Sequence, residues 1–232
     1  MHPKSSDSAL PEVFVSTTEL SRRVSQGIKD GALRPIGPKV YTRNLRDPPE
    51  LLVKRHLWQL VSALVPGALI ADRTALEIKP APDGSIFVVS DRKRDLELPG
   101  VVIRPRRGAP PQVGHDQPFT GGLYLSSEAR AYLDNMAPSR SYGGRARRTL
   151  TRAELETRLD DKIRSHGAPA LNKLRDLARQ LAPQLGREAE LRELERIIAA
   201  LLGTHEARLV TPRGRARQAG APYDPDRIHL LE

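Results

Sequence analysis

Apolar residues recur at helical spacing near the beginning of the chain. Three of them fall on one side of a helix: Leu20, Val24 and Ile28. Ser16 and Glu19 have the spacing of a capping box, so we expect this helix to begin at Ser16 and to end at Asp30-Gly31. Two short β-type runs, 33–36 and 40–42, then flank Gly37-Pro38-Lys39, which predicts a hairpin with a three-residue turn.

The middle of the chain changes from a long apolar pattern to a period of two. Residues 51–65 predict a helix that stops at Pro66-Gly67, and Asp72 is placed to cap a second, shorter helix. Three β-branched or apolar runs predict strands: 85–90, 101–104 and the weaker 123–126. These patterns favour a small α+β domain.

The C-terminal third carries three amphipathic patterns. Thr151 and Glu154 repeat the capping-box spacing and open a helix that Gly167 interrupts. Leucines or isoleucines then recur every three or four positions over 171–185 and 191–202. Each pattern has one apolar stripe, so the helices must pack on one another or on another domain.

Together these patterns predict the α+β class, with a small N-terminal unit, a mixed middle domain and a helical region. The expected divisions are a flexible tail (1–12), a helix-and-hairpin unit (13–49), an α+β domain (50–136), a basic linker (137–149), a helical region (150–204) and an extended tail (205–232). No internal repeat is found.

Composition narrows the class of function. The formal charge is +10 and the pI about 10.3, which attracts polyanions such as nucleic-acid phosphates. An arginine-rich proteome would give the same surplus, so charge alone leaves both explanations open. The sequence contains no Cys, which excludes disulfides and thiolate metal sites. It has no apolar run of membrane-spanning length and no secretory signal pattern, so we expect a cytoplasmic protein without membrane partners.

The predicted helix and hairpin have the arrangement of a winged-helix DNA reader, in which a helix enters the major groove and a hairpin follows the backbone. With its apolar side hidden, this unit presents eight candidate DNA-binding residues: Arg22, Arg23, Ser25, Gln26, Lys29, Arg34, Lys39 and Arg43. Arg and Gln suit base edges, whereas Lys and Ser suit phosphates. An ordinary surface helix with a basic, solvated face is the alternative.

Three segments carry a family resemblance: GALRPIGPKVYT (31–42), PGALIADRTALEI (66–78) and VSDRKRDLELPGVVIRPRR (89–107). In this order they resemble AbiEi-type antitoxins and related winged-helix regulators of toxin–antitoxin and phage-abortive systems. The resemblance implies a transcriptional regulator that acts on its own operon, with double-stranded DNA and a toxin as partners. Upstream of Ser16 there are too few residues for the first helices of a full helix-turn-helix. The reading unit would therefore be minimal, or completed by a partner or by a second copy in a homodimer.

The C-terminal half has a second resemblance. LTRAELETRLDDKIRSHGAPALNKLRDLARQLAPQLG (150–186) and ARQAGAPYDPDRIHLLE (216–232) resemble the segment that precedes the catalytic domain in long Fic-family proteins. That family transfers AMP with a His-Pro-Phe-x-x-Gly-Asn-Gly-Arg loop, which this sequence lacks. The alternative function is therefore a non-catalytic region that docks a Fic domain, in cis or in trans, and we expect no enzymatic activity in this chain.

Other candidate chemistry is weak. The six histidines show no metal-ligand spacing, and His56 is expected to be a hydrogen-bonded core or boundary residue. Trp58 is expected to pack in the core, and Asp160-Asp161 to lie on a solvated helix face. No catalytic residue, metal or cofactor is predicted. Six further arginines would extend a phosphate-binding surface or would simply be solvated: Arg104, Arg106, Arg107, Arg145, Arg147 and Arg148.

Overall fold

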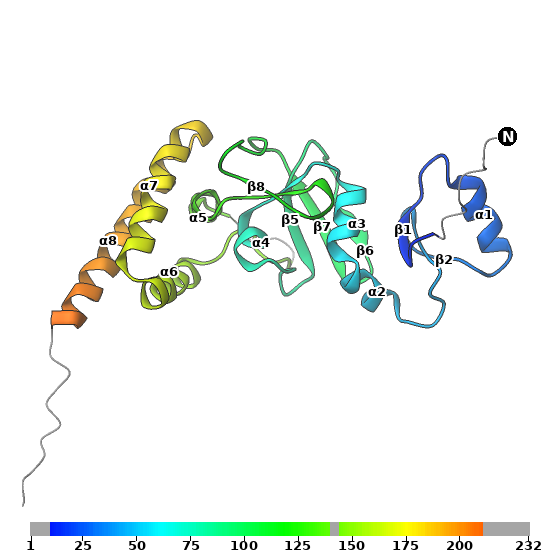
Figure 1. Ribbon diagram of the computed structural model, residues 1–232, viewed down its shortest axis with the longest axis horizontal. Helices are drawn as coiled ribbons and strands as arrows, with labels where there is room; N and C mark the ends of the chain where they lie inside the picture. Colours follow the sequence, from blue (N-terminus) through cyan, green and yellow to red (C-terminus); the bar gives the residue numbers. More distant parts are fainter. Residues whose placement is uncertain (1–9, 140–143, 211–232) are drawn as a thin grey trace, which may run out of the picture.

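Three antiparallel strands and one helix form the N-terminal unit of the computed structural model, which describes residues 10–139 and 144–210. The elements are β1 (Val13–Val15), α1 (Ser21–Lys29), β2 (Arg34–Gly37) and β3 (Val40–Thr42) (Figure 1). The strand order is β1-β3-β2, so the first strand pairs with the second strand of the hairpin. The hairpin expected from the sequence is confirmed, whereas β1 was not predicted.

Helix α1 begins five residues after the start that the capping-box spacing predicts. The backbone N–H of Ser16 donates to the carbonyl of Lys39 at 2.8 Å, so Ser16 continues the sheet and caps no helix. The residue before α1 is Leu20, which makes no side-chain capping bond. The predicted start is therefore wrong, because the hydrogen bond between Ser16 and the hairpin turn outweighs the local capping signal.

One face of the three-stranded sheet packs against α1. The buried residues of this contact are Phe14, Val24 and Leu33, and Leu20 packs against them while partly buried. Ile28 is 41% exposed, so the expected apolar stripe is only partly covered. Burying Val24 and Leu20 fixes the opposite, polar side of α1 toward solvent.

The other face of the same sheet packs against the middle domain. Val13, Ile36 and Val40 belong to the main core, together with Leu57 and Leu60 of α3 (Leu57–Leu64). The boundary expected near residue 49 therefore divides the chain into two segments that pack into one structure. Their apolar core is continuous.

The middle domain is a mixed six-stranded sheet with the order β6-β7-β5-β4-β9-β8. Its strands are β4 (Leu69–Ile70), β5 (Ser85–Val89), β6 (Leu96–Leu98), β7 (Val101–Arg106), β8 (Gln117–Pro118) and β9 (Tyr124–Leu125). A single 3-10 turn, η1 (Thr120–Gly122), precedes β9. The pairs β5–β7 and β4–β9 are parallel, and the remaining pairs are antiparallel. The strands predicted at 85–90, 101–104 and 123–126 are confirmed as β5, β7 and β9.

The single helix predicted at 51–65 is divided into α2 (Pro49–Arg55) and α3. His56 lies between them, and its ring contacts Glu12 through Nε2 and Gln59 through Nδ1, at 2.7 and 3.2 Å. His56 is thus the hydrogen-bonded boundary residue expected from the sequence. Trp58 packs against the main core and meets Phe119 edge-on, with ring centroids 5.4 Å apart.

Asp72 opens α4 (Asp72–Glu77), the short helix expected at this point, but its side chain does not cap the helix. The buried carboxylate accepts from Arg106 at 2.7 and 3.0 Å and from Arg148 at 2.7 Å. Because Arg148 belongs to the predicted linker, this ion pair ties part of the linker to the middle domain. Residues 140–143 of that linker lie outside the described residues.

The helical region packs against the last helix of the middle domain. That helix of the middle domain is α5 (Glu128–Met136), and the helical region itself consists of α6 (Arg152–His166), α7 (Ala168–Leu185) and α8 (Glu188–Val210). The Thr151–Glu154 capping box is confirmed, and the expected leucine stripes form a buried cluster. Helix α8 runs beyond residue 204, and residues 211–232 of the expected tail lie outside the described residues.

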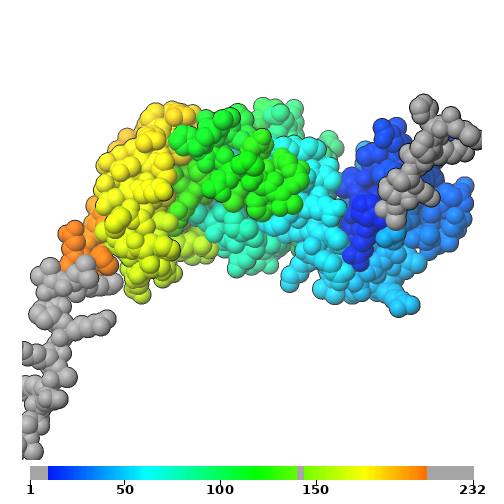
Figure 2. Space-filling model, viewed as in Figure 1, coloured from blue at the N-terminus to red at the C-terminus, as the bar shows by residue number. Residues whose placement is uncertain are grey.

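The molecule is elongated, with α1 at one end and the helical region at the other (Figures 1 and 2). Within the part of the chain that the structure describes, no helix combines the length and the apolar character needed to cross a membrane.

Candidate nucleic-acid interface

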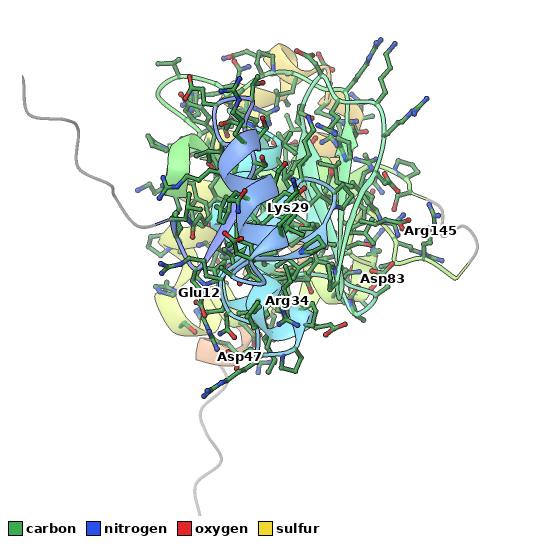
Figure 3. The ribbon with its side chains drawn as sticks, turned by 90° about the vertical axis from the view of Figure 1, so that its right-hand side faces the viewer. Glu12, Lys29, Arg34, Asp47, Asp83 and Arg145 are labelled. Atoms are coloured by element: carbon green, nitrogen blue, oxygen red, sulfur yellow. The ribbon has the colours of Figure 1, made fainter. Side chains whose placement is uncertain are left out.

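The polar side of α1 is the outermost surface at its end of the molecule. Its exposed residues include all five helix candidates: Arg22, Arg23, Ser25, Gln26 and Lys29. Figure 3 looks at this end and shows α1 in front, with Lys29 on it. The Gln26 amide donates to Asp30 Oδ1 at 2.8 Å, so it must exchange this bond before it can read a base. The helix thus offers mainly cationic and hydroxyl donors.

The hairpin tip is held in a strained conformation. Two residues, Pro38 and Lys39, make the turn, so the expected three-residue turn is shortened by the inclusion of Gly37 in β2. Lys39 has φ = +61°, a left-handed conformation that glycine normally occupies in a type II turn. A lysine at this position costs about 1 kcal/mol or more relative to an unstrained residue. The chain therefore places an exposed cation where backbone geometry favours glycine.

Arg34 does not present its guanidinium to solvent as the sequence predicted. Its Nε donates to the carbonyl of Asn44 at 3.0 Å, and its Nη2 donates to the carbonyl of Asp47. These bonds hold the loop after β3, and the side chain is partly buried. Arg34 is therefore a structural residue, and we remove it from the contact set. Arg43, directly after β3, is exposed.

A polar cluster around Glu12 fixes this unit against the middle domain. The Glu12 carboxylate accepts from Asn44 at 2.8 Å and from Arg55 at 3.1 Å, and it meets His56 Nε2 at 2.7 Å. The hydrogen bonds from Asn44 and His56, with the nearby charge of Arg55, lower the pKa of Glu12 from 4.5 to about 2.

The Glu12 cluster was missed from the sequence, which predicted a flexible tail over 1–12. Residues 1–9 lie outside the described residues, but the backbone carbonyl of Glu12 accepts from Arg43 and Thr42. No local signal marks such a residue, because all its partners lie at least thirty positions away. The tail prediction is wrong for this residue.

The N-terminal unit carries exposed cations without acidic partners. Five described cations of this unit make no ion pair and no side-chain hydrogen bond: Arg22, Lys29, Lys39, Arg43 and Arg46. Exposed cations without an ion pair also occur in the rest of the described chain, among them Lys54, Lys79, Lys93, Arg94, Lys173 and Arg192. Glu12 and Asp47 pair instead with Arg55 of α2. The N-terminal cations therefore keep their full charge available for an external anion.

Four of the six arginines considered in the middle domain and linker make ion pairs. Arg104 lies 3.5 Å from Asp83 and 3.6 Å from Asp95, and Arg145 lies 3.6 Å from Asp95. Arg106 and Arg148 bind Asp72, as described above. The extended phosphate-binding surface considered from the sequence is thus reduced to the exposed Arg107 and Arg147.

Comparison with known proteins gives no assignment: no protein family, curated protein or solved structure matches this chain. No cluster of three or more potential metal ligands occurs within residues 10–139 and 144–210. The case for a function therefore rests on the geometry and charge of the chain itself.

Proposed function

We propose that this chain binds double-stranded DNA through α1 and the β2–β3 hairpin. The observation that carries the proposal is the set of exposed cations on α1 and the hairpin, of which Arg22, Lys29 and Lys39 make no ion pair within the described chain. A solvated basic surface helix would not require a lysine in a left-handed turn conformation. This strained lysine favours a functional role for the charge at the tip.

The mode of binding follows from the shape of the unit. A helix of nine residues at the end of an elongated molecule can enter a major groove without obstruction from the other residues that the structure describes. The exposed Arg22 and Lys29 then face base edges and phosphates, while Lys39 contacts the backbone. The strand–helix–hairpin order and the β1-β3-β2 sheet support a winged-helix type of unit. Its second sheet face is covered by α3 of the same chain, so folding needs no second copy.

The class of regulator rests on the sequence resemblance. The three segments similar to AbiEi-type antitoxins favour a cytoplasmic transcriptional regulator that represses its own toxin–antitoxin or defence operon. The toxin partner and a homodimer on a symmetric operator are part of this proposal.

The test is binding of the full chain to its own upstream DNA, measured by fluorescence anisotropy across a salt series. Contacts from four cations predict a slope of log affinity against log salt of about −3 to −4. The Arg22→Ala, Arg23→Ala double variant should bind about tenfold more weakly or worse. A charge-matched control, Lys79→Ala with Arg192→Ala, removes exposed cations elsewhere and should bind like the parent. Affinity independent of salt would refute phosphate binding.

The second candidate is a non-catalytic region that docks a Fic domain. The helical region lies at the opposite end from α1, so it can hold a partner without obstructing α1 (Figure 1). An in-frame His-Pro-Phe-x-x-Gly-Asn-Gly-Arg motif downstream in the reading frame would favour this candidate, and DNA binding by α1 is compatible with it.

A further inference from the structure

The loop between β5 and β6 (residues 91–95) carries three consecutive cations, Arg92, Lys93 and Arg94, and all three are exposed. Arg92 donates from Nη1 to the carbonyl of Leu64 at 3.4 Å, which anchors the loop to the last turn of α3. Lys93 and Arg94 make no ion pair and no side-chain hydrogen bond within the described chain. Their charges are therefore available to an external anion.

A fourth cation, Arg107, follows β7 beside this loop. The parallel strands β5 and β7 pair Val89 with Arg106, and the backbone N–H of Ser90 donates to the carbonyl of Arg106 at 3.0 Å. The chain therefore leaves both strands at the same edge of the sheet. The exposed Arg107 lies next to the start of the β5–β6 loop at that edge.

The two acidic residues of the loop offset only part of this charge. Asp95 lies 3.6 Å from Arg104 and 3.6 Å from Arg145, so cations outside the loop neutralise it. Asp91 makes no ion pair among the described residues. One unpaired carboxylate thus accompanies the exposed cations of the loop and of Arg107, and the edge keeps an excess of positive charge.

Contacts with α2 place this loop on the same side of the molecule as the tip of the β2–β3 hairpin. Arg34, at the start of β2, donates to the carbonyl of Asp47, whose carboxylate pairs with Arg55 of α2. At the turn between β6 and β7, a Cβ on Gly100 would lie 3.5 Å from Cγ of Glu50 in α2. Helix α2 therefore lies at the Arg34 end of β2 and at the Gly100 end of β6. The opposite ends, which are the hairpin tip and the β5–β6 loop, both lie away from α2.

The hairpin and β6 are also in contact. Strand β6 forms the edge of the six-stranded sheet that faces the N-terminal unit (Figure 1). A Cβ on Gly37 would lie 2.9 Å from Cδ2 of Leu98. From Leu98 to the end of the loop the strand spans three residues, or about 10 Å. Since one turn of a duplex is about 34 Å long, the hairpin tip and the loop can reach the same turn.

We propose that the β5–β6 loop makes a second set of phosphate contacts on the duplex that α1 and the hairpin bind. Lys93 and Arg94 contact the backbone at one flank of the site, and Arg107 supports them from the end of β7. Contacts of this kind add affinity and fix orientation without reading sequence. This inference rests on the proposed function, because it assigns the loop to the same DNA.

The test combines fluorescence anisotropy across a salt series with hydroxyl-radical footprinting of the full chain on its own upstream DNA. The loop variant is Lys93→Ala with Arg94→Ala. Two lost phosphate contacts should make the slope of log affinity against log salt less negative by about 1.8 and weaken binding about tenfold. The footprint should lose protection at one flank and keep the positions that depend on Arg22 and Arg23.

The matched control is Lys79→Ala with Arg192→Ala, which removes one exposed lysine and one exposed arginine elsewhere and should keep the slope and footprint of the parent. Because Lys93 and Arg94 are exposed, the loop variant should also keep the urea midpoint of the parent. A second variant, Lys93→Gln with Arg94→Gln, removes the charge but keeps longer polar side chains and should show the same loss of slope.

Two results distinguish this inference from the proposed function. If the parent binds with salt dependence and the Arg22→Ala, Arg23→Ala variant is weakened, but both loop variants keep the slope and flank protection of the parent, the loop contact is overturned and DNA binding by α1 stands. If the affinity of the parent is independent of salt, both the proposed function and the loop contact are overturned.

Discussion

Replacing Lys39 with glycine separates the stability of the hairpin from its charge. Lys39 has φ = +61°, and a left-handed backbone costs a non-glycine residue about 1–2 kcal/mol. Glycine removes this strain but adds freedom to the unfolded chain, worth about 0.4–1 kcal/mol in the opposite direction. We therefore expect Lys39→Gly to raise the free energy of unfolding by about 0.5–1 kcal/mol.

The same substitution should weaken DNA binding, because it removes the cation at the hairpin tip. One lost phosphate contact should make the slope of log affinity against log salt less negative by about 0.9. Lys39→Ala is the companion variant, because it removes the same charge and keeps the strain. Urea denaturation should distinguish the two variants, and anisotropy with the upstream DNA should not.

Two results would refute this reasoning. If both Lys39 variants bind DNA with the parent affinity and salt slope, the tip does not contact phosphate. If Lys39→Gly is no more stable than Lys39→Ala, the left-handed conformation stores no strain. The exposed Lys79 of the middle domain provides the control, since Lys79→Ala should alter neither quantity.

Three further outcomes are expected. Arg22→Ala and Lys29→Ala, each alone, should leave the free energy of unfolding, measured by urea denaturation, within about 0.5 kcal/mol of the parent, because both side chains are exposed. Each should reduce affinity for the upstream DNA, and a matching loss of stability would assign the residue a structural role instead. Glu12 has a lowered pKa, so its stabilising contribution is present above pH 4.5 and is lost as the pH falls toward 2. Urea midpoints measured over this range should fall more steeply for the parent than for Glu12→Gln, and parallel curves would contradict the assignment. Asp72→Asn removes a buried carboxylate that pairs with Arg106 and Arg148, although Arg106 keeps its contact with Asp134 at 3.1 Å, and it should cost about 3 kcal/mol of unfolding free energy. A loss below about 1 kcal/mol would show that the pair is readily replaced.

The helical region could be predicted from the sequence because its signals are local. Thr151 and Glu154 lie three positions apart, and the capping box they form needs no other part of the chain. Ser16 and Glu19 have the same spacing, yet Ser16 pairs with the hairpin turn instead. The difference lies in long-range pairing, which a local pattern does not contain.

The candidate DNA-binding residues could likewise be predicted only where their position depends on a local pattern. The exposed face of α1 follows from helical periodicity, so Arg22 and Lys29 lie on the solvent side as expected. Arg34 has the same chemistry, but carbonyls from a loop ten and thirteen positions away capture it. The network of Asp72 with Arg106 and Arg148 likewise joins residues 34 and 76 positions apart. Such partners are set by topology and not by spacing.

The two-sided packing of the first sheet decides whether α1 can be used as a portable module. A fragment that ends near residue 49 would expose Val13, Ile36 and Val40, because their partners belong to α3. Transplanting the reading helix onto another protein would therefore require α3 and the strands beneath it as well. For the same reason, a repacking of α3 by any bound partner would be transmitted to the orientation of α1.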